Sequence, residues 1–205
     1  MKTPGLSDVA QWVWEHRKSV VFGEHTGDWP GDLFGARWFD RCQCQSPLRT
    51  RERSGWYWFE LEGNIEGIIE TDGVPTAWLP AAACKFGPVA EENVKRFGDL
   101  LCHRQTGFNV VYNGHEKDVA ARVRSHFAVR NDSTGALGLS YYPRLAGRRW
   151  TLSFLHTGLL AAADILDNSA EIVRIVKGLA ASKSGRVAVE SAWRAVYGWP
   201  LLCKG

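Results

Sequence analysis

The sequence has no long apolar run and no recognisable export signal. No stretch of about 18 consecutive apolar residues occurs, although a membrane-spanning helix needs at least that length. The first residues, Met1 to Gly5, lack the apolar segment of a signal peptide. We therefore expect a cytoplasmic protein that has no membrane-spanning helix.

Cysteine is sparse and irregularly spaced. The five cysteines are Cys42, Cys44, Cys84, Cys102 and Cys203. Their odd number and uneven spacing argue against a disulfide framework and favour a reducing compartment. A zinc site that joins Cys42 and Cys44 to Cys84 or to Cys102-His103 would need unusual ligand spacing, so buried or unreactive thiols are the preferred interpretation.

Two widespread catalytic motifs are also missing. The sequence contains neither His-Glu-x-x-His nor Gly-x-x-x-x-Gly-Lys, which argues against a metalloprotease and against a nucleotide hydrolase. His25, His103 and His156 show no partner spacing that indicates a zinc site.

The sequence has only a small excess of positive charge. The 25 Lys and Arg residues against 22 Asp and Glu residues leave a net charge of +3, which is too small to indicate a nucleic-acid partner. The arginines are clustered, however, at Arg49, Arg51 and Arg53, at Arg122 and Arg124, and at Arg144, Arg148 and Arg149. Such clusters suit phosphate contacts and suit a solvated surface equally well.

Aromatic side chains are abundant. Ten Trp, nine Phe and five Tyr residues fit a dense core, or flat faces that stack on bases or sugars, and composition does not choose between them. The 205 residues suit one domain with its own core, and 45% apolar and 23% charged residues are ordinary globular values. Disordered, collagenous and coiled-coil proteins are thereby excluded.

Residue patterns predict strands and helices that mix along the chain. Strands are expected over 56–59, 108–112 and 150–155, with 66–71 as a hairpin partner of the first strand. Helices are expected over 7–18, near 90–97, after Asp118, after a capping box at 168–171, and over 184–197. The expected fold class is α+β, with a small, mostly antiparallel sheet flanked by helices.

Local details place the candidate residues. In the strand 56–59 the two tryptophans fall on one face, and the tyrosine and phenylalanine fall on the other. Asn113-Gly114 predicts a tight turn that ends the second strand. Asp118 is the expected N-cap of the next helix, where Arg122 and His126 share a face because they are four residues apart.

This arrangement resembles the GIY-YIG nuclease family. Gly55-Trp56-Tyr57 corresponds to the family's first triplet, Gly-Ile-Tyr, and Tyr112-Asn113-Gly114 corresponds to the second, Tyr-Ile-Gly. In the family an arginine follows the second tyrosine by ten residues, and several members have a histidine four residues after that arginine. Arg122 and His126 stand at these positions.

The remaining match is on the last helix. The family's metal-binding glutamate precedes a proline on a late helix, and Glu190 stands ten residues before Pro200. Residues 55–59 and 108–127 match well, the last 20 residues match loosely, and the first 50 do not match. Asn113 replaces the signature isoleucine, the triplet tyrosines are 55 residues apart where the family has a shorter connection, and Leu201-Leu202-Cys203 replaces a frequent asparagine.

The resemblance implies a metal-dependent DNA endonuclease, and a site-specific restriction enzyme in particular. It implies a nuclease core over 51–205 with an insertion at about 60–107, and an N-terminal extension, 1–50, that contacts double-stranded DNA. The candidate catalytic residues are Tyr57, Tyr112, Arg122, His126 and Glu190. The candidate DNA-binding residues are Arg49, Arg51, Arg53, Arg124, Arg148 and Arg149. Glu190 would bind Mg²⁺ or Mn²⁺, and cutting two strands with one site per chain favours a homodimer.

The side chains suit phosphodiester hydrolysis. Arg122 would hold the scissile phosphate, and Tyr112 would orient the nucleophile or the phosphate through its hydroxyl. A phenol with a pKa of about 10 is a poor base at neutral pH, so Tyr57 needs metal-bound water or a nearby cation to favour its phenolate. His126 would relay a proton, because an imidazole pKa of about 6.5 lies near the working pH.

Each of these residues also has an ordinary structural interpretation. Tyr57 and Tyr112 suit strand packing, and Arg122 with His126 suits a solvated helix face. The Glu190 carboxylate suits an ion pair with Arg186 or Arg194. His115, which follows the second triplet, is expected to be an exposed turn residue. The alternative functions are a nucleic-acid-binding module without cleavage and a protein that docks a partner through its aromatic surface.

Overall fold

The fold is described from a computed structural model. The described residues are 3–23, 53–65, 67–70, 79, 81, 83–128, 135–142, 145, 148–162 and 170–204. They form a four-stranded sheet of order β1-β4-β2-β3 in which every neighbouring pair is antiparallel. The strands are β1 (Lys18–Gly23), β2 (Gly55–Leu61), β3 (Val110–Glu116) and β4 (Arg149–His156). The expected α+β class with an antiparallel sheet is confirmed.

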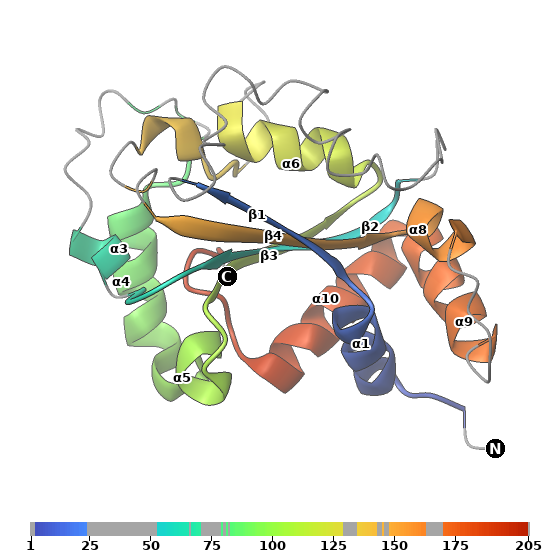
Figure 1. Ribbon diagram of the computed structural model, residues 1–205. Helices are drawn as coiled ribbons and strands as arrows, with labels where there is room; N and C mark the ends of the chain where they lie inside the picture. The colour runs from blue at the N-terminus through green and yellow to red at the C-terminus, as the bar shows by residue number, and fades with distance from the viewer. Residues whose placement is uncertain are drawn as a thin grey trace.

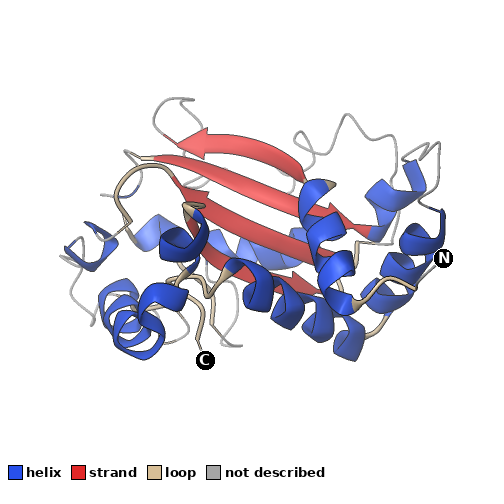
Figure 2. Cartoon of the chain, turned by 90° about the horizontal axis from the view of Figure 1, so that it is seen from below, coloured by secondary structure: helices blue, strands red, loops and turns tan. Residues whose placement is uncertain are grey.

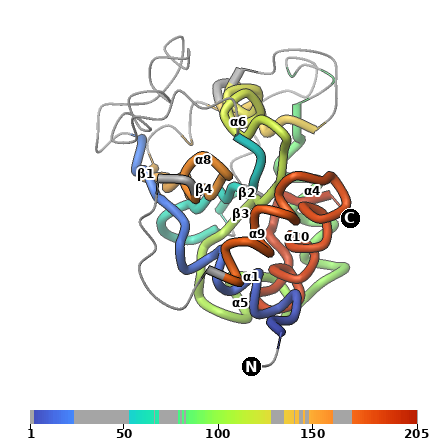
Figure 3. The backbone as a smooth tube through the Cα atoms, turned by 90° about the vertical axis from the view of Figure 1, so that its right-hand side faces the viewer, coloured from blue at the N-terminus to red at the C-terminus, as the bar shows by residue number. Residues whose placement is uncertain are grey.

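Helices cover both faces of this sheet. The α-helices are α1 (Leu6–Glu15), α3 (Gly67–Glu70), α4 (Phe86–Phe97), α5 (Cys102–Thr106), α6 (Val119–Ala128), α8 (Thr157–Ala162), α9 (Ala170–Ala181) and α10 (Lys183–Tyr197). Short 3₁₀ turns occupy Gly98–Leu100 and Leu139–Tyr141. Helix α6 lies on one face, while α1, α9 and α10 lie on the other (Figure 1), and the side view in Figure 3 shows the same layers. None of the described helices is long and apolar enough to span a membrane.

The alternation expected for β2 is confirmed. The Trp58 ring packs against Trp14 of α1 and Trp193 of α10, with centroids 5.4 and 6.0 Å away. The Phe59 ring faces the opposite layer and lies 5.8 Å from Phe127 of α6. Figure 2 shows the helices that cover the tryptophan face of the sheet. The aromatic residues of β2 therefore build the core on both sides of the sheet.

The hairpin partner expected at 66–71 is wrong. Gly67–Glu70 forms the short helix α3, and the Ile68 amide donates a hydrogen bond to the Ile65 carbonyl. Both isoleucine side chains are buried, and their spacing of three residues suits a helical turn rather than a strand. The strands that flank β2 are β3 and β4.

The turn expected at Asn113-Gly114 is also wrong. Strand β3 continues through both residues to Glu116, with Asn113 opposite Trp58 and Gly114 opposite Tyr57. The Asn113 side chain accepts a hydrogen bond from Arg194, so tertiary contacts replace the local bonds that would favour a turn.

The N-terminal region belongs in part to the core. Helix α1 ends at Glu15, earlier than expected: the His16 backbone leaves the helical conformation, and its Nδ1 atom lies 2.8 Å from the Trp12 carbonyl oxygen. Residues Lys18–Gly23 then form the edge strand β1, which the sequence pattern did not predict and which pairs with β4. Residues 24–52, with the aromatic stretch, Arg49, Arg51, Cys42 and Cys44, lie outside the described residues.

Candidate active site

A cavity of about 440 Å³ lies at the edge strand β3. Because β3 borders the sheet, side chains from α6 and α10, which cover opposite faces, both reach it. The residues that line it are Tyr57, Cys84, Tyr112, Asn113, Gly114, His115, Glu116, Arg122, Gly135, Glu190, Arg194, Leu202, Cys203 and Lys204. Four of the five candidate catalytic residues, Tyr57, Tyr112, Arg122 and Glu190, thus share one cavity.

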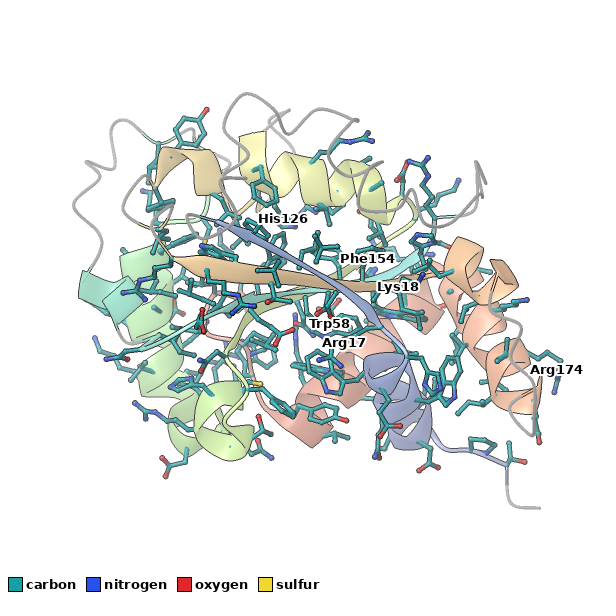
Figure 4. All side chains as sticks on the ribbon, viewed as in Figure 1. Arg17, Lys18, Trp58, His126, Phe154 and Arg174 are labelled. Carbon is teal, nitrogen blue, oxygen red and sulfur yellow. The ribbon has the colours of Figure 1, made fainter. Side chains whose placement is uncertain are left out.

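The fifth candidate, His126, lies behind this cavity. It is fully buried between α6 and the sheet (Figure 4) and contacts Tyr57 rather than the open space. The Leu137 amide donates a hydrogen bond to His126 Nδ1 over 3.0 Å, so that nitrogen carries no proton. The Nε2–H of the neutral ring then donates to the Tyr57 hydroxyl oxygen over 2.8 Å. His126 therefore fixes the tyrosine through a single tautomer.

Tyr57 and Tyr112 are both protonated near neutral pH, because the cavity environment raises the pKa of each phenol. Burial raises the pKa of Tyr57 well above its ordinary value, although the nearby Arg122 guanidinium opposes the shift. Burial also raises the pKa of Tyr112, with the same opposition from Arg122. Arg122 interacts with both phenols and donates a hydrogen bond to the Gly135 carbonyl over 3.3 Å. Near neutral pH the two phenols therefore face the cavity as neutral hydroxyls beside the Arg122 guanidinium.

The pKa of His126 is lowered well below its ordinary value. Burial is the largest cause, and the positive charge of Arg122 adds to it. A neutral imidazole whose Nδ1 lone pair is already engaged by Leu137 suits hydrogen-bond donation to Tyr57 better than proton relay.

Glu190 reaches the cavity from α10. Its Oε1 atom accepts a hydrogen bond from Arg194 one helical turn later, and its Oε2 atom lies 3.6 Å from His115 Nε2. Its side chain is only 14% exposed. Burial raises the pKa of this carboxyl, and the charge and hydrogen bond of Arg194 oppose that rise. The expected pairing with Arg194 is present, whereas Arg186 is buried and donates to the Ala180 carbonyl.

Arg194 is itself held from three sides. Its Nε–H donates to Asn113 Oδ1 over 2.9 Å, its Nη2–H donates to Glu190, and its guanidinium carbon lies 4.4 Å from the Trp199 ring centroid. The Cys203 thiol lies 3.3 Å from the same Asn113 oxygen. Asn113, which departs from the signature isoleucine, therefore has a specific task, because it anchors the arginine that holds Glu190.

The described cysteines agree with the expected buried thiols. Cys84, Cys102 and Cys203 are buried and form no disulfide with one another. Burial raises the pKa of Cys102 and that of Cys203 to about 11, so both stay protonated near neutral pH. Within the described part of the chain, no group of three or more His, Cys, Asp or Glu side chains is placed to hold a metal ion.

Steric constraints explain why glycine occupies positions 55 and 114. A Cβ atom on Gly114 would lie 2.4 Å from the Tyr57 hydroxyl oxygen, because the tyrosine side chain covers this glycine across the strands. A Cβ atom on Gly55 would lie 2.0 Å from the Leu155 carbonyl oxygen of β4. Each glycine thus allows a close approach that a side chain would block.

None of the candidate DNA-binding arginines that the structure describes lines the cavity. Arg53 precedes β2, and its carbonyl accepts a hydrogen bond from the Val119 amide. Arg148 and Arg149 lie at the start of β4, near the far end of β2, where Arg148 donates to the Asn64 carbonyl over 2.9 Å. Arg124 is half-buried on α6. The positive side chains that line the cavity are instead Arg122, Arg194 and Lys204.

Sequence reasoning gave too little weight to two residues of the cavity. Arg194 was signalled by its spacing of four residues from Glu190, but that spacing alone describes a surface ion pair equally well. His115 stands two residues after Asn113 on β3, so the two side chains lie on the same face of the strand. This could be inferred only once the strand was known to continue through Asn113-Gly114.

Comparison of the chain with protein-family models, curated proteins and solved structures finds no match.

Proposed function

We propose that this protein is a metal-dependent endonuclease that hydrolyses phosphodiester bonds in double-stranded DNA, as a site-specific restriction enzyme of GIY-YIG type. The observation that carries the proposal is the convergence of Tyr57, Tyr112, Arg122 and Glu190 on one cavity, with His126 hydrogen-bonded to Tyr57. These residues come from β2, β3, α6 and α10. Their set offers a cation, two hydroxyls and a carboxylate to a phosphodiester.

Each residue has a physical role in this proposal. Arg122 pairs with a non-bridging phosphate oxygen and stabilises the charge that develops on it. The Tyr57 hydroxyl accepts from His126 Nε2–H, interacts with Arg122 and Tyr112, and orients the attacking water or the phosphate. Tyr112 supplies the second hydroxyl. His126 is a positioning residue, because it reaches the reaction only through Tyr57.

Glu190 fits a hydrated divalent cation. One carboxylate oxygen is held by Arg194, and the other faces His115 at the cavity wall. Mg²⁺ is commonly held by one or two carboxylates together with water and substrate phosphate oxygens. A cation bound there would supply charge stabilisation at the phosphoryl and leaving oxygens.

Cleavage assays test this function. Purified full-length protein is incubated with plasmid and phage DNA, modified and unmodified, in the presence of Mg²⁺ or Mn²⁺. Discrete fragments are expected, and both Glu190→Ala and Tyr57→Phe should lose them while they retain DNA binding. Glu62→Ala, an exposed glutamate outside the cavity, is the matched control and should cut normally. Cleavage that survives Glu190→Ala would contradict the assignment.

The second candidate is a nucleic-acid-binding module that retains the fold without cleavage. It is favoured by the Arg194–Glu190 ion pair, which partly neutralises the carboxylate, and by the protonated state of Tyr57. Salt-sensitive DNA binding by wild-type protein with no cleavage under any of these conditions would support this candidate over the nuclease.

A further inference from the structure

His115 and Glu190 face each other across the cavity at a distance that a direct bond does not explain. The His115 Nε2 atom lies 3.6 Å from Glu190 Oε2, which is too long for a hydrogen bond. Both side chains are mostly buried, at 18% and 14% exposed, and both line the cavity. His115 Nδ1 is buried and has no hydrogen-bond partner among the described residues. The His115 imidazole therefore lacks the hydrogen bonds that usually hold a buried structural histidine in place.

The separation matches two ligands of one metal ion. Ligand atoms at about 2.1 Å from a cation lie about 3.0 Å apart at a right angle and about 3.4 Å apart at the tetrahedral angle. The observed 3.6 Å needs only a small adjustment of either side chain to reach this range. A cation placed between the two atoms would also face the space that Tyr57 and Arg122 line.

The carboxylate is turned toward His115 by its neighbours. Arg194 binds Glu190 Oε1, and Asn113 and Trp199 hold the Arg194 guanidinium in place. The second oxygen, Oε2, is thereby left on the His115 side. His115 is placed by β3, whose backbone is paired with β2 at this point through Trp56. Both ligand atoms thus come from ordered elements, which favours a preformed site.

We propose that His115 and Glu190 together bind one divalent transition-metal ion and that the mixed nitrogen and oxygen ligands favour Mn²⁺ over Mg²⁺. Water completes the coordination, and phosphate oxygens do so when DNA is bound, a point that rests on the proposed function. The selectivity follows from ligand chemistry, because imidazole suits transition metals whereas Mg²⁺ prefers oxygen ligands. Within the described residues no third His, Cys, Asp or Glu joins the pair.

Metal titration of the full chain without DNA tests the site. Free Mn²⁺ is followed by electron paramagnetic resonance, and Mg²⁺ is added as competitor. His115→Ala and Glu190→Gln are each expected to weaken Mn²⁺ binding at least tenfold, and the double variant should lose little more than either one. His103→Ala and Glu62→Gln, which change the same residue types outside the cavity, are the controls and should bind as wild type. Wild-type affinity in His115→Ala would overturn the proposal.

A second variant guards against misfolding. His115→Asn keeps a polar side chain on the strand, and circular dichroism with thermal unfolding in the absence of metal identifies which variant is folded. If His115→Ala unfolds, the same tenfold loss is required of folded His115→Asn, and unchanged Mn²⁺ binding in that variant overturns the proposal. Tenfold weaker binding in either folded variant supports it.

Cleavage separates this inference from the proposed function. His115→Ala is expected to lower the ratio of the Mn²⁺-supported to the Mg²⁺-supported cleavage rate. If Mn²⁺ binding depends on both residues but no DNA is cut, the His115–Glu190 metal site is supported and the proposed nuclease activity is contradicted. If cleavage requires Glu190 while His115→Ala leaves both Mn²⁺ binding and this ratio unchanged, the nuclease activity is supported and the His115–Glu190 metal site is contradicted.

Discussion

The Nε2 atom of His126 lies 2.8 Å from the hydroxyl oxygen of Tyr57, and the Leu137 amide occupies the other ring nitrogen. This pair of hydrogen bonds sets the tautomer of a fully buried histidine and the position of a tyrosine at the cavity wall. The Tyr57 oxygen therefore accepts a hydrogen bond from His126 on its inner side, while Arg122 and Tyr112 are its partners on the cavity side.

His126→Leu should lower the cleavage rate by about 10² while DNA affinity stays nearly unchanged, because Tyr57 loses its hydrogen-bond donor. His126→Gln should recover part of the rate, since its amide oxygen can accept from Leu137 and its amide nitrogen can donate to Tyr57. Single-turnover cleavage and DNA-binding titrations measure the two effects. Equal rates for the two variants would show that hydrogen bonding to Tyr57 is unimportant.

Gly114→Ala should abolish cleavage. The new Cβ atom would lie 2.4 Å from the Tyr57 hydroxyl oxygen and 2.7 Å from its ring carbon Cζ, so the tyrosine has to move away from the cavity. Gly178→Ala is the matched control, because no atom lies within 4 Å of its added Cβ and the residue is on helix α9. The control should keep full activity and gain up to about 1 kcal/mol of stability. Full cleavage by Gly114→Ala would show that Tyr57 need not stay in place.

Stability should fall as the pH is lowered from about 6.5 toward 4, partly because of two buried histidines. Burial lowers the pKa of His156 to about 4, with Arg53 adding to the effect, and lowers that of His126 well below its ordinary value. The unfolded chain therefore binds protons that the folded chain does not, and stability present above pH 6.5 is lost on acidification.

Urea unfolding at several pH values measures this loss. The contribution of His156 is on the order of 3 kcal/mol by pH 4, from the difference between its folded and unfolded pKa values. His156→Phe should reduce the slope between pH 6.5 and 4, because it removes one of the two groups and leaves no buried ring nitrogen unpaired. A slope equal to that of wild type would exclude His156 as a contributor.

Trp193→Ala should lower the free energy of unfolding by about 3–5 kcal/mol. Trp193 is fully buried on α10, and its ring lies 5.4 Å from that of Trp14 and 6.0 Å from that of Trp58. The alanine would leave a cavity where α1, α10 and the sheet meet. Leu100→Ala changes a side chain that is 64% exposed and should shift stability by less than about 0.5 kcal/mol. Denaturant unfolding of both variants checks the difference.

Strand β2 and helix α10 were predictable because their signals are local. The aromatic alternation in 56–59 and the apolar stripe of the last helix reflect which faces are buried. The path of β3 through Asn113-Gly114 was not predictable, because the bond from Arg194 comes from a residue 81 positions away in the sequence. The helix α3 was missed although its signal is local, because the buried Ile65 and Ile68 have the helical spacing of three residues.

The sequence by itself determined the α+β class, the two faces of β2 and the set of candidate residues spread from Tyr57 to Glu190. Only the tertiary structure decided that four of them share a cavity and that His126 stands behind Tyr57. It also placed His115 opposite Glu190 and turned the carboxylate with Arg194. The physical reason is that patterns along a chain report burial and local propensity, whereas hydrogen-bond partners and ligand distances depend on how distant elements pack.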